Sequence, residues 1–358
     1  MIIDIVKVFL PAVGAFILGI AITPILTNYL YSHQMWQKRG GKTALDGSEA
    51  VVFSRLHKQT DEKTPRMGGI IVWFSSAVII IGIWLLSHFF PSEITEKLDF
   101  LSRNQTWIPL TTLVFGGLVG LINDYIEIKE GRNGSHGRGL SRTNRLTIVS
   151  IIALACAIWF YIKLDVTGIG LPFGLGELYL GPLFILLFLL TAIFIYAGGV
   201  IDGLDGLAGG VFTTMFGAYA GIAFYQQQFD LAAFCATVAG SILAFLWFNI
   251  PPARFYMTET GTMGLTITLT VVAFMTDRLG EGYGFLVLPV IALPLVVTVL
   301  SNLIQVFSKK FRGKKVFLVA PLHHHFEAIG WPAYKVTMRY WIVSVICAIL
   351  GITLALIG

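Results

Sequence analysis

Charged residues are scarce in this sequence. Asp, Glu, Lys and Arg together make up 13% of its 358 residues, whereas hydrophobic residues make up 56%. A soluble domain of ordinary composition has about 25% charged residues, and a disordered chain combines high charge with low hydrophobicity. The shortage of charge therefore excludes a soluble globular protein and an intrinsically disordered one. It indicates a helical protein that crosses the membrane several times.

Cysteine is also scarce, and two common nucleotide-binding motifs are missing. Cys156, Cys235 and Cys347 each lie inside an apolar run, so they supply neither a disulfide framework nor a thiolate metal site. The sequence has no GxxxxGK[ST] phosphate loop and no GxGxxG dinucleotide fingerprint. The nucleoside triphosphatase and dinucleotide-binding classes are excluded on this ground.

Apolar runs of bilayer length recur along the whole chain, which predicts an all-α polytopic membrane protein. The ninth run contains Pro289 and Pro294, and each proline removes a helical hydrogen bond, so we expect a kinked ninth helix. The segment 164–180 alternates apolar residues with glycine, which is consistent with a small hairpin. The about ten predicted spans are 3–30, 68–90, 107–122, 146–163, 181–199, 208–225, 231–249, 262–276, 284–307 and 340–357.

Lysine and arginine are distributed unevenly between the linkers. The linkers that follow spans 1, 3, 5, 7 and 9 hold 20 of the 25 basic residues. Because basic residues accumulate on the cytoplasmic side of membrane proteins, these linkers are predicted to face the cytoplasm and both termini to face outward. We expect a single transmembrane domain, 1–358, whose active site is built from linkers 31–67, 123–145, 200–207, 250–261 and 308–339.

Two groups of acidic and amide residues lie in these linkers. Asn123 and Asp124 end the third span, and Arg142 and Arg145 follow after a glycine-rich loop; ordinary interfacial anchoring is the alternative interpretation. Asp202 and the residue three positions later, within DGLDGLAGG, would share one face of a helical turn. Two acids without a basic neighbour favour a hard cation such as Mg²⁺, although a solvated turn would also hold them. The second acid of that pair is Asp205.

Two further groups follow in the sequence. Asn249, Tyr256 and Glu259 precede the eighth span, where Glu259 would also suit an ordinary helix N-terminus. Three consecutive histidines follow a basic stretch, and consecutive helical residues point about 100° apart, so they do not all bind one ion. Phosphate contacts or hydrogen bonds to carboxylates suit them better. These histidines are His323, His324 and His325.

Acidic residues suited to a hard cation, together with arginine and imidazole groups, indicate a phosphorylated substrate handled at the membrane surface. With these motifs in hand, the chain resembles the polyprenyl-phosphate N-acetylhexosamine-1-phosphate transferase superfamily, and within it the phospho-N-acetylmuramoyl-pentapeptide transferases. The likeness runs over nearly the whole chain. It rests on KTPRMGGI at 63–70, NDY at 123–125, DGLDGLAGG at 202–210, WFN at 247–249, PLHHHFE at 321–327 and KVTMRYW at 335–341.

The resemblance implies a Mg²⁺-dependent, usually dimeric enzyme of peptidoglycan synthesis in the bacterial inner membrane, with its site facing the cytoplasm. Such an enzyme moves phospho-MurNAc-pentapeptide from UDP-MurNAc-pentapeptide to undecaprenyl phosphate, giving lipid I and UMP, and no nucleic-acid partner is expected. It also implies catalytic roles for Asn123, Asp124, Arg145, Asp202 and His323 to His325, metal binding by Glu259, and substrate binding by Lys63, Asp205, Asn249, Tyr256 and Gln305, with Tyr256 stacking on uracil.

The sequence departs from the family pattern at three places. Asn123 replaces the first aspartate of D-D-Y, T-E-T-G-T at 258–262 replaces G-D-x-G-S, and Tyr196 and Gly199 replace two asparagines. Asn123 removes a residue sometimes proposed as a general base. Because the second pKa of a phosphate monoester is about 6, the lipid phosphate is already largely dianionic at neutral pH, and it needs positioning more than deprotonation.

Three other functions remain as alternatives. A membrane carrier also places acids near broken helices, and UMP release would distinguish an enzyme from it. A catalytically silent paralogue that binds lipid is motivated by Asn123 and Glu259. A sister transferase that uses UDP-GlcNAc is disfavoured by the triple-histidine segment.

Overall fold

The structure is a computed structural model that describes residues 2–36, 64–102, 105–132, 139–172, 174–280 and 282–357. Within the described chain, every regular element except one two-stranded hairpin is helical, which confirms the all-α prediction. The helices are α1 (Ile2–Ser32), α3 (Ile70–Phe89), α4 (Glu93–Leu98), α5 (Trp107–Arg132), α6 (Arg142–Lys163), α7 (Leu183–Gly198), α8 (Leu207–Tyr225), α9 (Phe229–Asn249), α10 (Thr258–Met275), α11 (Gly284–Ile291), α12 (Leu293–Arg312), α13 (Leu322–Ala328) and α14 (Ala333–Ile357), with two 3-10 turns at Gly199–Ile201 and Arg278–Gly280 and strands β1 (Gly168–Leu171) and β2 (Gly176–Tyr179).

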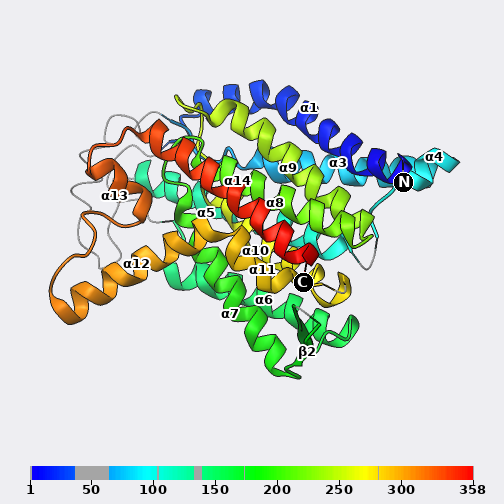
Figure 1. Ribbon diagram of the computed structural model, residues 1–358. Helices are drawn as coiled ribbons and strands as arrows, with labels where there is room; N and C mark the ends of the chain where they lie inside the picture. Colours follow the sequence, from blue (N-terminus) through cyan, green and yellow to red (C-terminus); the bar gives the residue numbers. More distant parts are fainter. Residues whose placement is uncertain are drawn as a thin grey trace.

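The long helices form one bundle whose two ends differ (Figure 1). Both chain termini lie at one end, as the predicted even number of crossings requires. The short helix α13 lies at the opposite end, which we call the α13 end. Large apolar side chains such as Ile17, Ile25 and Ile342 are exposed on the outer helices α1 and α14, where lipid would cover them.

Eight helices in the described part of the chain are long and apolar enough to cross a membrane: α1, α3, α5, α6, α7, α8, α9 and α14. The pair α11 and α12 together passes the same test, but their axes diverge by 68°. Pro294 lies in the first turn of α12, where its missing N–H costs no helical hydrogen bond. The predicted kink of the ninth span is therefore confirmed.

The predicted span 262–276 corresponds to α10, which is too polar in composition to be among those eight helices. Every residue of α10 except Glu259 is buried, including its six threonines. The threonine hydroxyls are satisfied internally, for example Thr266 donates to the carbonyl of Thr262 at 2.7 Å, and the hydroxyls of Thr268 and Thr112 lie 3.0 Å apart. Because neighbouring helices cover α10 on all sides, it needs no apolar surface.

Glycines allow α5 and α10 to approach closely. A Cβ atom at Gly116 would lie 2.8 Å from the Cα of Gly264, and one at Gly120 would lie 2.0 Å from the carbonyl oxygen of Glu259. Small residues at such contacts let two backbones pack in direct contact. This packing brings the end of α5 against the first turn of α10 at the α13 end.

The helix α5 is longer than the span 107–122 that the sequence predicts, because it continues to Arg132. Its extra turns carry Asn123 and Asp124, whose polar groups are hydrogen-bonded inside the protein and so do not end the helix. At the other end of the bundle, β1 and β2 form the predicted small antiparallel hairpin. Asp277 anchors this hairpin by accepting a hydrogen bond from the amide of Gly170 at 2.7 Å.

Candidate active site

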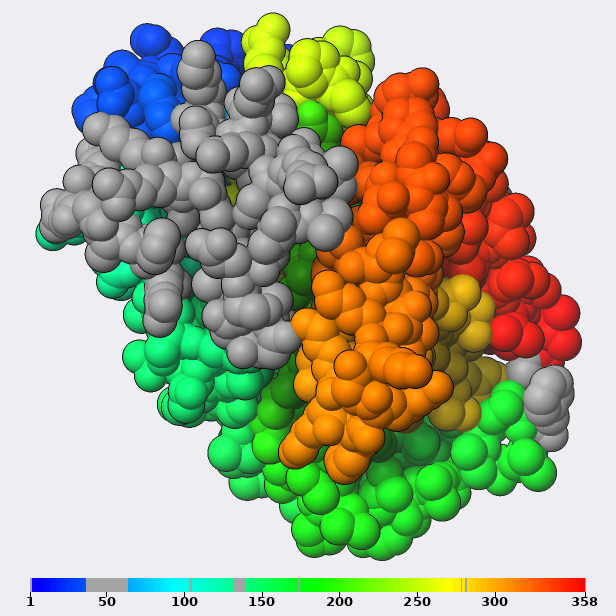
Figure 2. Space-filling view, turned by 90° about the vertical axis from the view of Figure 1, so that its left-hand side faces the viewer, coloured from blue at the N-terminus to red at the C-terminus, as the bar shows by residue number. Residues whose placement is uncertain are grey.

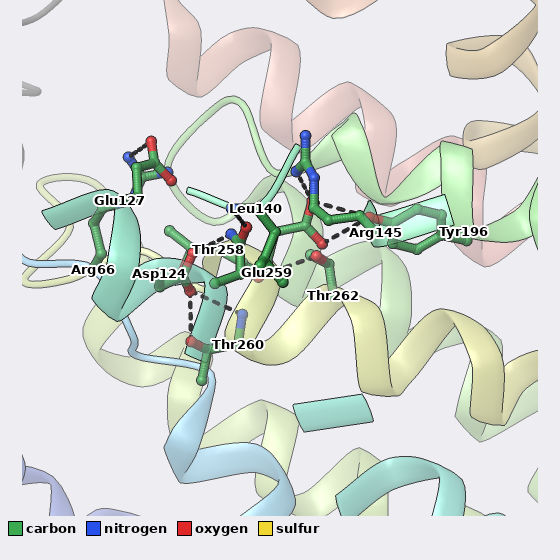
Figure 3. Close-up of polar contacts among 11 residues, drawn as sticks. Arg66, Asp124, Glu127, Leu140, Arg145, Tyr196, Thr258, Glu259, Thr260 and Thr262 are labelled. Carbon is green, nitrogen blue, oxygen red and sulfur yellow. Dashed lines mark hydrogen bonds and ion pairs between the residues drawn. The ribbon is translucent and has the colours of Figure 1, made fainter. Parts of the chain in front are cut away.

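Most of the predicted site residues that the structure describes gather at the α13 end. They come from the end of α5, the start of α6, the turn between α7 and α8, the first turn of α10, and α13. Figure 2 faces this end and shows α12 and α13 standing forward. Figure 3 shows how the side chains around the first turn of α10 point toward one another.

Thr258, the first residue of α10, joins two of the predicted acids. Its amide donates to Asp202 Oδ2 at 2.7 Å, and its hydroxyl donates to Asp124 Oδ2 at 2.5 Å. The same hydroxyl accepts a hydrogen bond from the amide of Met67 at 3.2 Å. The sequence around Thr258 has no local pattern that marks this residue as a contact between distant segments, so it is not among the predicted site residues.

Asp124 is fully buried, and its carboxylate is saturated by hydrogen bonds. In addition to the Thr258 hydroxyl, Oδ2 accepts from the amide of Thr260 at 2.9 Å and from the hydroxyl of Thr260 at 2.5 Å. Asn123 donates to Oδ1 at 3.3 Å, and Asn123 Oδ1 accepts from the amide of Leu140 at 3.0 Å. Asp124 therefore acts as an acceptor at the N-terminus of α10, where the helix dipole also favours a negative charge.

Glu259 is paired with Arg145, as Figure 3 shows. Arg145 Nη1 lies 2.5 Å from Glu259 Oε1, and the two side chains are 27% and 21% exposed, so the pair remains open to ligands. The phenol of Tyr196 donates to the same carboxylate. Glu259 precedes the apolar part of α10; burial raises the pKa of its carboxyl above the usual value, and the Arg145 guanidinium opposes this shift.

Asp205 and Asn249 fix the loop that leads into α10. Asp205 Oδ2 accepts from the amide of Ala253 at 3.0 Å. Asn249 is buried; its Oδ1 accepts from the amide of Gly206 at 3.0 Å and its Nδ2 donates to the carbonyl of Phe255 at 2.8 Å. The residues 202–206 form a turn rather than a helical segment, so Asp202 and Asp205 contact different points of the loop 253–258.

The histidines of α13 pack against the same turn. A Cβ atom at Gly203 would lie 2.6 Å from His323 Nε2 and 2.8 Å from His324 Nε2, so both rings face the backbone between the two aspartates. His324 Nδ1 lies 2.7 Å from Glu327 Oε2, which orients its ring. His325 Nδ1 accepts from the amide of Leu318 at 3.2 Å, and its ring lies against that of Phe317.

The remaining predicted residues have other surroundings. The backbone of Tyr256 pairs with residues 65–68, where the first linker ends, through its amide to the carbonyl of Pro65 and its carbonyl to the amide of Gly68. Gln305 is buried; its Oε1 accepts from the amides of Val316 and Phe317, and its Nε2 donates to the carbonyl of Phe317. Lys63 lies outside the described residues.

Oxygen donors are abundant in this site, but they do not form a closed cation cage. Among the described residues, no group of three or more His, Cys, Asp or Glu side chains is arranged to hold a metal ion. Asp124, Asp202 and Glu259 meet around the first turn of α10 and are held there by backbone, hydroxyl and guanidinium donors.

A polytopic helical bundle that carries carboxylates, an arginine and histidines at one end has the features of an integral membrane transferase. Residues 106–277 match the family described as Glycosyl transferase family 4. The chain is 34% identical to the phospho-N-acetylmuramoyl-pentapeptide-transferase of Anoxybacillus flavithermus, over 97% of each chain. It is 33% identical to that of a Geobacillus species, over 94% of this chain and 96% of the relative, and 32% identical to that of Chloroflexus aggregans, over 99% and 91%.

The chain therefore belongs to the phospho-N-acetylmuramoyl-pentapeptide transferase family, which confirms the resemblance drawn from its motifs. Membership makes it a multi-pass membrane enzyme of the phosphosugar transferase class. The roles of the individual site residues remain predictions.

Proposed function

We propose that this protein transfers phospho-MurNAc-pentapeptide from UDP-MurNAc-pentapeptide to undecaprenyl phosphate, at the cytoplasmic face of the bacterial inner membrane. An oxygen of the lipid phosphate forms a bond to the sugar-linked phosphorus, the pyrophosphate bond within the nucleotide breaks, and UMP leaves. The products are lipid I and UMP. The observation that carries this proposal is the convergence of Asp124, Asp202, Glu259 and Arg145 on the first turn of α10.

The charges of this site suit phosphoryl transfer, in which catalysis consists mainly of positioning and charge stabilisation. Arg145 is partly exposed, and its planar guanidinium matches the geometry of phosphate oxygens. His323 and His324 lie against Gly203, on the chain that carries Asp202, and so supply further donors beside the same turn. In this arrangement the cationic and imidazole groups contact phosphate, and the carboxylates face a cation.

Mg²⁺ fits these residues by the chemistry of their donors. Asp202 and Glu259 flank Thr258 and offer carboxylate oxygens, which are hard ligands. Mg²⁺ is usually bound by one or two carboxylates together with substrate phosphates rather than by an all-protein cage, so two carboxylates suffice here. The bound ion would neutralise charge on the pyrophosphate. We propose Asp202 and Glu259 as its protein ligands.

Asn123 is compatible with activity in this proposal. It donates to Asp124 and accepts from the amide of Leu140, so it holds the end of α5 against the loop before α6. The lipid phosphate, with its second pKa of about 6, is already ionised at neutral pH. We propose that Asn123 and Asp124 position the site around this nucleophile and that no enzymatic base is required.

The direct test incubates the purified protein with UDP-MurNAc-pentapeptide, undecaprenyl phosphate and Mg²⁺, and follows lipid I and UMP together. The proposal expects both products in equal amounts, and their loss when Mg²⁺ is removed. A parallel reaction with UDP-GlcNAc tests the sister activity, and its exclusive use would contradict the proposal. Absence of UMP with any of these substrates would favour a carrier or a silent paralogue. The homodimer that the family resemblance implies is tested separately, by the mass of the protein in detergent.

A further inference from the structure

Tyr196 is one of the positions at which the sequence departs from the family pattern, and its hydroxyl lies at the Glu259 carboxylate. Tyr196 is in the last turn of α7, and its oxygen is 3.3 Å from Oε1 and 3.3 Å from Oε2 of Glu259 (Figure 3). An un-ionised phenol donates one hydrogen bond. Equal distances place that donor between the two oxygens, so it restrains the plane and the direction of the carboxylate.

Arg145 is the second partner of Glu259. Among the described residues, Arg145 and Tyr196 are the two groups that hydrogen-bond to this carboxylate, and Arg145 contacts Oε1. The two partners differ in what else they are able to bind. A guanidinium exchanges a carboxylate for a phosphate readily, because both anions offer two oxygens to its planar fork of N–H donors, whereas a phenol has a single donor and no charge.

Asp124 and Asp202, the acids that also meet at the first turn of α10, do not depend on an exchangeable partner. Asp124 accepts backbone and hydroxyl hydrogen bonds from Thr258 and Thr260, and Asp202 accepts from the amide of Thr258. Within the described part of the chain, no backbone amide donates to the Glu259 carboxylate, and its side chain has one more rotatable bond than an aspartate. Once Arg145 engages a phosphate, Glu259 would be free to turn away from the site unless another group held it.

We propose that Tyr196 is a positioning residue of the transferase site, which keeps the Glu259 carboxylate in place when Arg145 transfers its hydrogen bonds to the substrate pyrophosphate. The inference rests on the proposed function, because it assigns Arg145 to phosphate and Glu259 to the cation. In this proposal Tyr196 acts through Glu259, to which its hydroxyl is bonded.

The first test is Tyr196→Phe, which removes the hydroxyl and keeps the ring. A hydrogen bond to a charged group contributes about 1.5 kcal/mol, so we expect kcat to fall about tenfold. We also expect the Mg²⁺ concentration for half-maximal activity to rise several-fold, with the KM for UDP-MurNAc-pentapeptide unchanged. The increased Mg²⁺ requirement is the signature of a misplaced metal ligand, which a merely structural defect would not produce.

Tyr219→Phe is the matched control. The Tyr219 hydroxyl donates to the carbonyl of Gly284 at 2.9 Å, and the side chain is fully buried between α8 and α11. This variant therefore loses a tyrosine hydrogen bond in the same bundle, away from the first turn of α10. We expect it to lower the unfolding temperature without changing kcat or the Mg²⁺ requirement.

A binding measurement makes the test independent of turnover. Mn²⁺ is the probe, and its binding to the purified protein with UDP-MurNAc-pentapeptide is followed by electron paramagnetic resonance. We expect Tyr196→Phe to weaken Mn²⁺ binding several-fold, and we expect no further loss when Tyr196→Phe is added to Glu259→Gln, since both changes act on one contact.

The outcomes separate the two proposals. If the wild-type protein forms no lipid I, the proposed function fails, while the Mn²⁺ measurement still tests Tyr196. If the wild type is active and Tyr196→Phe matches it in kcat, Mg²⁺ requirement and Mn²⁺ binding, the positioning role is wrong. A Tyr196→Phe variant that is less stable but has an unchanged Mg²⁺ requirement would equally overturn it.

Discussion

Thr258 adopts a backbone conformation that is unusual for its residue type. Its φ is +54°, in the left-handed region, which a β-branched side chain rarely occupies. Three hydrogen bonds hold this conformation. The amide of Thr258 donates to Asp202, its hydroxyl donates to Asp124, and the same hydroxyl accepts from the amide of Met67. Strain of this kind persists where the surrounding contacts determine the geometry, and such places are often functional sites.

The strain at Thr258 predicts an unusual order of stability for two small substitutions. Thr258→Gly and Thr258→Ala both remove the hydroxyl, but glycine adopts a positive φ without cost. We expect Thr258→Gly to be more stable than Thr258→Ala by about 1 kcal/mol, measured by thermal unfolding in detergent. Elsewhere in a helix alanine is the more stable of the two, so a more stable Thr258→Ala would show that the residue is not strained.

The carboxylates of the site make the next prediction. Alanine at Asp202, Asp205 or Glu259 should lower kcat roughly a hundredfold or more, the scale of a lost transition-state contact, in the lipid I assay. Glu259→Asp keeps the charge with one methylene less, and we expect it to retain activity. Glu93→Ala is the control, since Glu93 lies on α4 in an exposed ion pair with Lys97. Near-normal activity in the Asp202 and Glu259 alanine variants would contradict the metal-site assignment.

At the scale of elements, the site depends on how closely α13 approaches the turn before α8. Gly203 permits this approach, because any side chain there would meet the rings of His323 and His324. Gly203→Ala should displace α13 and lower kcat at least tenfold, an effect of about 1.4 kcal/mol or more on the activation barrier. Gly217→Ala in α8 meets no atom within 4 Å, and we expect it to be active and no less stable than the wild type. Equal activity of the two variants would show that this approach is unimportant.

The elements themselves were largely predictable from the sequence, whereas their contacts were not. Apolar runs predict the spanning helices, and Pro289 and Pro294 predict the bend between α11 and α12 because a proline acts on its own helix. The continuation of α5 to Arg132 was missed, since its polar residues find partners on α10. No local pattern encodes such a partner.

The candidate site shows the same division. The motifs selected Asp124, Arg145, Asp202 and Glu259, which the structure brings to one turn. The contact of Tyr196 with Glu259 joins residues 63 positions apart on two helices, and it follows from packing alone. The resemblance implies that Gln305 binds substrate, which stays a prediction, whereas its amide contacts with the backbone at Val316 and Phe317 are marked by no sequence pattern. A polar residue in an apolar helix indicates a partner without identifying it.

For the whole molecule, the distribution of basic residues predicts which end faces the cytoplasm. The native cysteines are buried, so an introduced cysteine reports its own accessibility. Lys315 lies in the exposed segment that follows α12, and Glu93 lies on exposed α4, so Lys315→Cys and Glu93→Cys are the two test variants. In intact cells, a membrane-impermeant maleimide should label Glu93→Cys and not Lys315→Cys, and in inverted vesicles the reverse. The opposite pattern would contradict the proposed orientation.

The central claim, phosphosugar transfer at this site, is tested most directly by running the reaction backward. One pyrophosphate bond breaks and another forms, so substrates and products are close in free energy, and labelled UMP should return to the nucleotide sugar. We expect radiolabelled UMP to be exchanged into UDP-MurNAc-pentapeptide when lipid I and Mg²⁺ are present, and we expect Glu259→Ala to lose this exchange. Exchange that proceeds without lipid I, or that survives unchanged in Glu259→Ala, would contradict the account.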